Sequence, residues 1–368
     1  MQFVENRYNI GLRKRFSDFA NDFGRDRRRK MASLKDIAAA CNVSVATVSK
    51  ALNDQHDVSQ KTKDLIRSKA RELGYFPNSA AKALKTNRSY NIGVLFVDEA
   101  QSGLTHDYFS NVLDSFKRTI EKDDYDLTLV NCSKRHERSM TYLERARYRG
   151  FDGIAIACID FKDPQVTELV ESDIPVVTID YIFNSRIAVL SDNVKGMKDL
   201  LTYVWQRGHR KIAYIHGGDS SVTQARVSSF FTTAAELGLK IPETYIREAD
   251  YRDTKETHDI TLELLDLDDP PTCILFPDDF AGFGGISAIQ ERGLRIPEDI
   301  SVAGYDGIVL GRRIVPRLTT IRQDTERIGS LAAEKLIRLI ENPRGTIIEH
   351  VVVDGSLDTG GTVASLET

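Results

Sequence analysis

Residues 34–53, LKDIAAACNVSVATVSKALN, contain two short helical patterns joined by a tight turn. Apolar side chains recur at the spacing of one helix face, at Leu34, Ile37, Ala38 and Cys41. Asn42 suits the turn, because asparagine tolerates left-handed backbone. The stretch therefore predicts a pair of short helices packed against each other.

Polar residues mark where both helices begin. Ser33, with Asp36 three residues later, resembles a capping box, and Ser44 can cap the second helix. The second helix turns Val48 and Leu52 inward and leaves Val45, Ala46 and Lys50 on its other face. A short helix with small residues and a cation on its outer face suits the major groove of DNA, although a generic helical hairpin has the same pattern.

A third helix is expected from Ser59 to Leu73, with Gly74 as its C-terminal cap. Residues 43–53, VSVATVSKALN, followed by residues 73–85, LGYFPNSAAKALK, resemble the lac repressor (LacI/GalR) family of bacterial transcription regulators. The resemblance covers about residues 33–356. It implies a helix-turn-helix head, a hinge helix and an effector-binding core.

Charge is unevenly distributed along the chain. The whole chain has a net charge of −4, but residues 1–90 contain 19 basic and 9 acidic residues, against 31 and 45 in the remainder. A basic head on an acidic body is typical of a module that meets phosphates, attached to one that does not. A solvated basic arm is the alternative.

Composition bounds the remaining classes. A length of 368 residues predicts two or three domains. No apolar run of membrane-spanning length and no signal peptide occur, so a cytoplasmic, nucleoid-associated protein without a membrane partner is expected. The cysteines have no metal-ligand spacing and are interpreted as buried thiols, with neither metal nor cofactor expected: Cys41, Cys132, Cys158 and Cys273.

Residues 1–30 resemble nothing in the family. We expect them to be a disordered extension or an incorrectly assigned start, with Met31 as the native start, because polar and charged sequence buries too little to offset the entropy of ordering. The alternative is a genuine basic arm that adds phosphate contacts.

From Asn91 onward, apolar runs of strand length alternate with helical segments in two similar series. Strands are expected at 91–97, 125–131, 152–157 and 175–180, then near 211–215, 245–249, 272–276 and 300–304. This alternation predicts an α/β fold with two parallel sheets and a ligand cleft at the carboxyl ends of their strands. The family resemblance implies a two-lobed, periplasmic-binding-protein-like core of Rossmann-like subdomains.

Polar residues follow several of these strands. Arg226, Asp278, Asp279 and Asp306 combine one guanidinium with several carboxylates, which suits hydrogen bonding to the hydroxyls of a sugar. Tyr108, Phe109 and Tyr251 could supply flat faces for a sugar ring, and Asp160 is a further candidate ligand. The alternatives are helix packing for Tyr108 and Phe109, an N-cap role for Asp279, and a nucleobase or nucleoside as effector.

The family resemblance sharpens this site. Residues 226–230, RVSSF, are similar to the R-L-x-G-F motif whose arginine contacts effector, and residues 302–306, VAGYD, match the motif whose aspartate holds the ligand. Asp278 stands where relatives commonly carry Asn, and Tyr251 where they carry a stacking ring. Residues 318–324, LTTIRQD, match the segment that returns the chain to the first lobe.

The expected organisation has five parts. These are the extension, 1–30; the helix-turn-helix domain, 31–77; the hinge helix and linker, 78–90; the first lobe, 91–190 plus 322–349; and the second lobe, 191–321 plus 350–368.

DNA contacts follow from the head and the resemblance. Residues expected to face base edges are Val45, Ala46, Thr47 and Lys50, the last donating to guanine. Residues expected to contact phosphates are Ser44, Ser49, Asn53, Ser59, Lys61 and Thr62. The resemblance implies a minor-groove hinge that includes Asn78, Ala81, Leu84 and Lys85, with Leu84 as a wedge.

Each head of such a regulator reads one half-site, so a homodimer on a pseudo-palindromic double-stranded operator is expected. Residues 354–368 contain no heptad pattern, which argues against a tetramer. An enzyme is the rival class, but the chain contains no HExxH, no G-x-S-x-G and no P-loop. The run at residues 282–285, GFGG, is interpreted as close packing in or beside a helix rather than a phosphate cradle.

Overall fold

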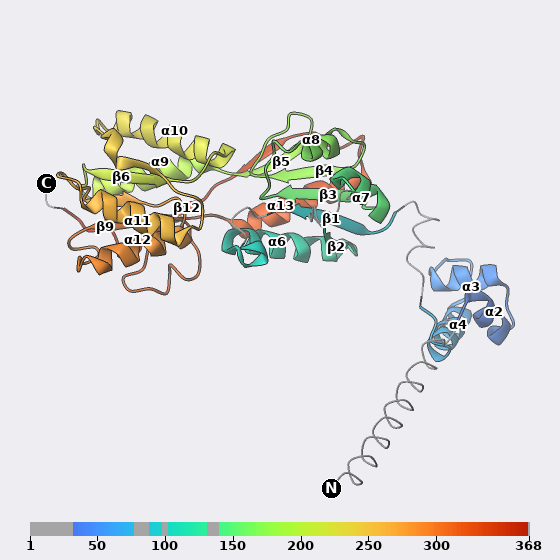
Figure 1. The fold of residues 1–368 in the computed structure, drawn as a ribbon. Coiled ribbons are helices and arrows are strands. Elements are labelled where there is room, and N and C mark those ends of the chain that lie inside the picture. The colour runs from blue at the N-terminus through green and yellow to red at the C-terminus, as the bar shows by residue number, and fades with distance from the viewer. Residues whose placement is uncertain (1–31, 77–87, 98–101, 131–139, 367–368) are drawn as a thin grey trace, which may run out of the picture. The chain divides into compact units, whose positions relative to one another are not determined.

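The computed structural model describes residues 32–76, 88–97, 102–130 and 140–366 (Figure 1). The chain divides into two compact units, one ending at Asn87 and the other beginning at Arg88. The first unit is the N-terminal head, and the second is an α/β core. The predicted extension and hinge helix lie outside the described residues.

The head contains three helices, α2 (Leu34–Cys41), α3 (Val45–Leu52) and α4 (Gln60–Glu72). Ser33 and Asp36 form the predicted capping box on α2, and Asn42 ends that helix with a left-handed φ of 52°. The side chains of Ser44 and Ser59 cap α3 and α4 by accepting backbone N–H bonds. Local sequence therefore determines where each helix starts and how the first one ends.

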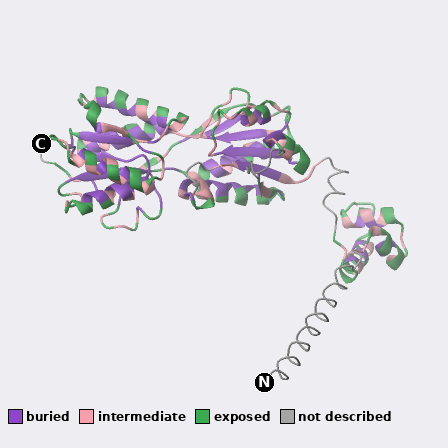
Figure 2. Ribbon diagram, in the orientation of Figure 1, coloured by how far each residue is buried: buried purple, intermediate pink, exposed green. Residues whose placement is uncertain are grey.

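A small apolar core holds the three helices together. Its fully buried members include Ile37 of α2, Val48 and Ala51 of α3 and Ile66 of α4. The faces that do not contribute to this core remain exposed, as the green outer surfaces of Figure 2 show.

Two six-stranded sheets organise the core unit. The first has the order β11-β5-β4-β3-β1-β2 and the second β12-β10-β9-β8-β6-β7. The strands of the first sheet are β1 (Asn91–Phe96), β2 (Asp126–Leu129), β3 (Gly153–Ala157), β4 (Val176–Ile179), β5 (Ile187–Ser191) and β11 (His350–Val353). Those of the second are β6 (Ile212–His216), β7 (Ile246–Glu248), β8 (Cys273–Leu275), β9 (Ser301–Asp306), β10 (Thr319–Arg322) and β12 (Ser356–Asp358).

All pairings are parallel except that between β10 and β12. The central strands are buried on both faces, so they form continuous apolar runs rather than alternating patterns, and Figure 2 shows them in purple. The predicted α/β class is thus confirmed.

Helices cover both faces of each sheet, as Figure 1 shows. In the first lobe these are α6 (Asp107–Ile120) and α13 (Thr325–Glu341) on one side and α7 (Tyr142–Arg149) and α8 (Pro164–Glu171) on the other. In the second lobe they are α9 (Asn193–Gln206) and α10 (Ser221–Glu236) on one side and α11 (Thr254–Leu265) and α12 (Asp279–Glu291) on the other.

The boundaries between the lobes differ from those predicted from the sequence. Residues 350–353 form β11, which pairs with β5 in the first sheet, so the predicted assignment of this segment to the second lobe is wrong. Backbone pairing decides this placement, because the apolar residues of 350–353 would suit either sheet. At the other end, residues 88–90 belong to the first lobe rather than to a linker, since Ser89 and Tyr90 donate backbone bonds to the Asp152 carboxylate.

The glycine run of α12 is close packing, as predicted. A Cβ on Gly284 would lie 1.8 Å from the carbonyl oxygen of Thr254, and one on Gly285 would lie 2.2 Å from the ring of Phe276. Only glycine lets α12 approach the start of α11 and the Phe276 ring, which follows β8, this closely.

Candidate functional site

The outer face of α3 carries the residues expected to read bases. Val45, Ala46 and Lys50 are exposed, Thr47 is half-buried, and Val48 and Ala51 on the opposite side are buried. An exposed Val45, with 40% of its surface accessible, is free to contact a thymine methyl.

Several residues expected to contact phosphates already have partners within the head. The Ser44 and Ser59 hydroxyls accept the N–H groups of Thr47 and Thr62 at 3.0 and 3.3 Å, and each also bonds the threonine hydroxyl at 2.8 Å. The Asn53 amide donates to the Ser49 carbonyl at 2.7 Å. These side chains hold the helix ends, and a phosphate contact would have to share them.

The loop that follows α3 contributes two carboxylates. Asp54 accepts bonds from Arg67 and lies 3.0 Å from Lys63, both on α4. Asp57 contacts the ammonium of Lys50 directly, which lowers the pKa of the Asp57 carboxyl. Asp57 was not among the residues selected from the sequence.

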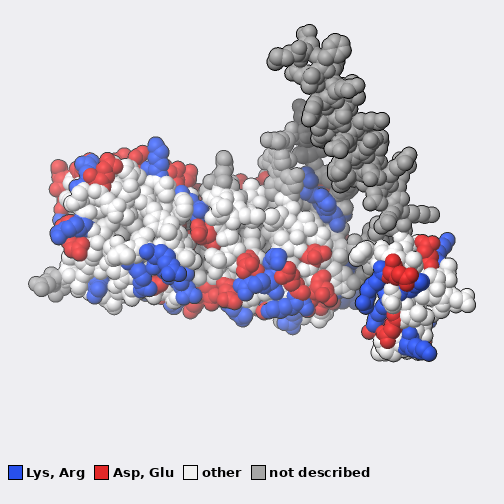
Figure 3. All heavy atoms as spheres, turned by 90° about the horizontal axis from the view of Figure 1, so that it is seen from below, with Lys and Arg blue, Asp and Glu red and all other residues white. Residues whose placement is uncertain are grey.

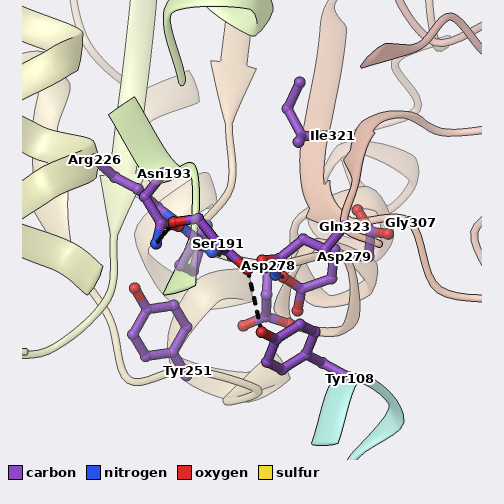
Figure 4. Close-up of polar contacts among 12 residues, drawn as sticks. Tyr108, Ser191, Asn193, Arg226, Tyr251, Asp278, Asp279, Gly307, Ile321 and Gln323 are labelled. Carbon is purple, nitrogen blue, oxygen red and sulfur yellow. Dashed lines mark hydrogen bonds and ion pairs between the residues drawn. The ribbon is translucent and has the colours of Figure 1, made fainter. Parts of the chain in front are cut away.

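In the core, Arg226 of α10 is the centre of a buried polar cluster (Figure 4). Its Nε donates to Asn193 Oδ1 at 2.8 Å, its Nη1 donates to the Pro277 carbonyl at 3.0 Å, and its Nη2 lies 3.8 Å from Asp306 Oδ1. The guanidinium carbon is 3.5 Å from the centroid of the Tyr305 ring. Packing and hydrogen bonds thus fix this cation in one orientation.

Asp306 ends β9 with a φ of 105°, a conformation that L side chains rarely adopt. Its Oδ1 accepts a bond from the Gln323 amide at 2.7 Å. Burial raises the pKa of the Asp306 carboxyl to about 7, although nearby Arg226 opposes that rise. Asp306 can therefore change its charge near neutral pH.

The first lobe supplies a tyrosine–aspartate pair. The Tyr108 hydroxyl donates to Asp180 Oδ2 at 2.6 Å and bonds the Ser191 hydroxyl at 3.2 Å, while the other Asp180 oxygen accepts the Ser191 N–H at 2.8 Å. Burial raises the pKa of Asp180, and the charge of Arg226 in the second lobe opposes it. Tyr108 is buried: its ring packs in the first-lobe core, and its hydroxyl bonds Asp180 and Ser191.

Tyr251 lies at the second-lobe side of the cluster, after β7. Its hydroxyl bonds the Thr223 hydroxyl at 2.9 Å, and its ring packs so closely on Gly217 that a Cβ there would lie 2.2 Å from it. The Arg226 guanidinium is 6.0 Å from the ring centroid. Glycine at 217 therefore makes room for the ring beside the arginine.

The paired aspartates Asp278 and Asp279 have structural roles that differ from those expected. Asp278, rather than Asp279, is the N-cap of α12, and its oxygens accept the N–H groups of Phe280, Ala281 and Arg252. The N-cap alternative for Asp279 is thus wrong by one residue, because α12 starts at Asp279 itself, one residue earlier than that role requires.

Asp279 is fully buried and accepts bonds from the Thr320 hydroxyl and the Ile308 N–H at 2.7 and 2.8 Å. Burial, together with the charge of Asp306, holds the pKa of Asp279 well above its usual range. Gly304 permits this arrangement, since a Cβ there would lie 2.2 Å from Asp279 Oδ1.

Two residues selected from the sequence have other surroundings. Asp160 is exposed after β3, and its Oδ1 accepts the N–H of Lys162 within its own turn, so it is not in the cluster. Phe109 is half-buried and packs edge-on against Phe96, His106 and Tyr108. The helix-packing alternative describes Phe109 better than a ring-stacking role.

One arginine connects the two lobes at the edge of the cluster. Arg252 follows Tyr251 with a φ of 65°, and its guanidinium contacts Ser102 Oγ at 2.9 Å and Asp107 Oδ2 at 3.1 Å in the first lobe. It also lies 4.1 Å from the centroid of the Phe280 ring. Lys162 and Asp219 form a second, exposed link between the lobes at 2.9 Å.

The sequence did not predict four residues of the cluster and its edge: Asp180, Asn193, Arg252 and Gln323. Asp180 follows β4 directly, so the rule that identified Asp306 at the end of β9 would also have found it. No comparable signal marks Asn193, Arg252 or Gln323. Asn193 and Gln323 contact Arg226 and Asp306 across segments that are far apart in the chain, and the role of Arg252 depends on how the two lobes meet.

Among the residues that the structure describes, no group of three or more His, Cys, Asp or Glu side chains is placed to hold a metal ion. No described helix combines the length and apolarity that a membrane span requires. On the surface shown in Figure 3, basic and acidic side chains of the core are intermixed.

Comparisons with known proteins agree with this architecture. Residues 33–78 match the family described as bacterial regulatory proteins, lacI family, and residues 201–363 match the periplasmic binding protein-like domain. The chain is 30% identical over 319 residues to the HTH-type transcriptional repressor PurR of Escherichia coli O139:H28 (strain E24377A / ETEC), covering 85% of this chain and 92% of that protein.

Solved structures are also similar. The lac repressor dimer bound to operator and the anti-inducer ONPF has 25% sequence identity and a TM-score of 0.79, covering 91% of this chain and 100% of that one. A LacI family transcriptional regulator from Enterococcus faecium with bound ribose has 25% identity and a TM-score of 0.66, covering 75% and 100%.

A helix-turn-helix head, two parallel-sheet lobes and a buried arginine–carboxylate cluster between them thus occur in one chain. These features and the extended similarity exclude the rival interpretation as an enzyme. The chain belongs to the lacI family of bacterial regulatory proteins and is a DNA-binding transcriptional regulator.

Proposed function

We propose that this regulator is a repressor controlled by a small carbohydrate or sugar derivative that binds between the two lobes. The observation that carries the effector class is the buried Arg226 guanidinium, oriented by Asn193 and Tyr305 beside the carboxylates of Asp180 and Asp306. The proposed contacts are Tyr108, Asp180, Arg226, Tyr251 and Asp306.

Hydrogen-bonding capacity favours a ligand rich in hydroxyl groups. Ionised carboxylates only accept hydrogen bonds, whereas a guanidinium only donates them. A sugar hydroxyl does both, so adjacent hydroxyls can bridge Asp306 and Arg226. Tyr251, held beside Arg226, offers a ring face for the C–H groups of the sugar.

Asp278 is a weaker candidate for direct contact. Both of its oxygens are bonded to backbone N–H groups, so we propose that it positions the start of α12 and residue 252. The alternative effector is a nucleobase or nucleoside. The acceptor atoms of such a ring require hydrogen-bond donors from the protein, and Arg226 is the strongest donor in the cluster.

We also propose that the protein acts as a homodimer on a pseudo-palindromic operator. Support comes from the segment between β9 and β10, which exposes the aliphatic side chains of Val309, Leu310 and Val315. Val315 is 96% exposed. The similar lac repressor structure is a dimer on operator. In this proposal α3 enters the major groove with Val45, Ala46, Thr47 and Lys50 toward the bases.

The hinge contacts of Asn78, Ala81, Leu84 and Lys85 lie outside the described residues and stay predictions. A titration of the protein against the DNA upstream of its own gene, with scrambled competitor and stated salt, tests the regulator itself. Sugar and nucleoside panels added to the complex then test the effector class; a response to nucleosides alone would contradict the carbohydrate proposal.

We expect effector affinity to depend on pH through Asp306. Hydroxyls that donate to this carboxylate favour its ionised form, so binding releases a proton when the free site is protonated. Because the pKa of Asp306 in the free protein is about 7, affinity should fall as the pH is lowered from 8 to 6, by at most about tenfold per pH unit. Calorimetry in buffers of different ionisation enthalpy measures the released proton.

Asp306→Asn provides the control for that experiment. The substitution keeps the size of the side chain and removes its titration. We expect this variant to bind effector more weakly than wild type, and its affinity should lack this part of the pH dependence. A wild-type affinity that rises on acidification would show that the effector prefers the protonated carboxyl instead.

We expect Arg252→Ala to lower effector affinity by about tenfold. The arginine holds the lobes together through Ser102 and Asp107, and a ligand that contacts both lobes binds best when they are held in this way. Lys162→Ala is the matched comparison, because its partner Asp219 is also in the other lobe but both side chains are largely exposed. Equal effects of the two substitutions would contradict a special role for Arg252.

A further inference from the structure

The loop between α3 and α4 divides its two acidic residues between two faces of the head. Asp54 turns toward α4, where Lys63 and Arg67 are its partners. Asp57 turns toward the outer face of α3 and contacts Lys50. The loop is anchored at both sides of Asp57, because the Gln55 N–H donates to the Lys50 carbonyl at 3.0 Å and Val58 packs in the head core.

This position is costly for a carboxylate in a DNA-binding head. A negative charge that faces DNA repels the phosphates, and an exposed ion pair contributes little to folding. The Lys50 and Asp57 side chains are 47% and 52% exposed, so neither is buried by the head itself. Stability of the head therefore does not explain why Asp57 is placed beside Lys50.

A paired ammonium and carboxylate match the edge of a G·C base pair in the major groove. Guanine presents the acceptors O6 and N7 there, and cytosine presents its N4 amino donor. O6 and N4 are themselves hydrogen-bond partners at about 2.9 Å, which is the spacing of a bonded lysine and aspartate. Lys50 could donate to guanine while Asp57 accepts from the cytosine of the same pair.

We propose that Asp57 is a second base-reading residue, which together with Lys50 recognises one G·C pair in each operator half-site. An A·T pair also has one amino group, but it lacks the two adjacent acceptors that guanine offers to a lysine. The free head holds the two side chains together, so the recognising pair is formed before DNA binds. The inference rests on the proposed placement of α3 in the major groove.

The test begins with the wild-type protein and random duplexes, from which the preferred half-site is selected at fixed salt. The base pair that depends on Lys50 is the one whose preference is lost by Lys50→Ala. Two modified duplexes then separate the contacts at this pair. In one, 7-deazaguanine removes N7; in the other, N4-methylcytosine replaces the amino hydrogen that is not used in pairing and faces the major groove.

We expect N4-methylcytosine to weaken wild-type binding by about tenfold, within the range for a base contact. Asp57→Ala and Asp57→Asn should bind the unmodified half-site more weakly relative to scrambled DNA and should lose most of the sensitivity to N4-methylcytosine. Both variants should keep their sensitivity to 7-deazaguanine, because Lys50 remains. Lys50→Ala should lose the sensitivity to 7-deazaguanine.

Glu72→Gln is the matched control, because it removes one negative charge from the head at the last residue of α4. It should leave the base preference unchanged. If Asp57→Ala instead raises the affinity for specific and scrambled DNA alike and stays as sensitive to N4-methylcytosine as wild type, Asp57 merely opposes phosphate and the inference is wrong. If Lys50→Ala changes no base preference, the placement of α3 fails and the inference fails with it.

Discussion

Arg226→Ala is expected to abolish the response to effector and to leave operator affinity of the effector-free protein nearly unchanged. The substitution removes the fixed donor of the cluster and leaves Asn193 Oδ1 and the Pro277 carbonyl without it. Loss of one member of a buried charged pair costs about 2–5 kcal/mol in binding, so effector affinity should fall at least about thirtyfold. Calorimetry with the effector and an operator titration measure the two properties separately.

Because Arg226 is buried, its loss also threatens the fold of the second lobe. Breaking a buried ion pair typically costs about 3–5 kcal/mol, so thermal unfolding must be followed alongside binding. Arg226→Lys keeps the positive charge and most of the volume but cannot reproduce the planar set of donors. It should remain folded and still bind effector poorly. Full effector response in Arg226→Lys would contradict the role of guanidinium geometry.

Gly284→Ala is expected to destabilise the second lobe by about 3 kcal/mol, the upper part of the usual range for overpacking. The added Cβ would lie 1.8 Å from the Thr254 carbonyl, a backbone atom that moves only if α11 and α12 separate. Asp278 and Asp279 lie at the start of α12, and α11 follows the loop that contains Tyr251 and Arg252. Effector affinity should therefore fall together with stability, as denaturant unfolding and calorimetry would measure.

Gly311→Ala is the comparison for this prediction. Its Cβ would make only an ordinary contact of 3.4 Å with Leu318, and its φ is not in the left-handed region. We expect a change in unfolding free energy of less than about 1 kcal/mol. Equal stability of the two variants would show that α11 and α12 adjust without cost.

In the head, the local sequence was sufficient to predict the helix caps and the turn. The Ser33–Asp36 capping box, the Asn42 turn, and the caps Ser44 and Ser59 were all predicted and are confirmed. Each depends on contacts between residues at most a few positions apart. Asp57 was missed because its partner is seven residues away, across a loop whose path the pattern does not determine.

In the core, apolar runs predicted eight parallel strands, including the edge strands β2 and β7, but four strands and a helix were not anticipated. β11 and β12 are edge strands, β5 and β10 lie next to them in the two sheets, and α13 follows β10 along the chain. Residues 350–353 were assigned to the wrong lobe for the same reason. An edge strand acquires its place from pairing with a distant partner, and its own composition does not identify that partner.

The sequence by itself determined the family, the α/β class, the charge division between head and core, and the polar residues at the carboxyl ends of strands. These depend on short motifs and on periodicity, which act over a few residues. The tertiary structure alone decided that Asp180, Asn193 and Gln323 join Arg226 and Asp306, that Asp278 caps a helix, and that Arg252 links the lobes. Those contacts connect segments far apart in the chain, where sheet order and the approach of two lobes determine which polar groups meet.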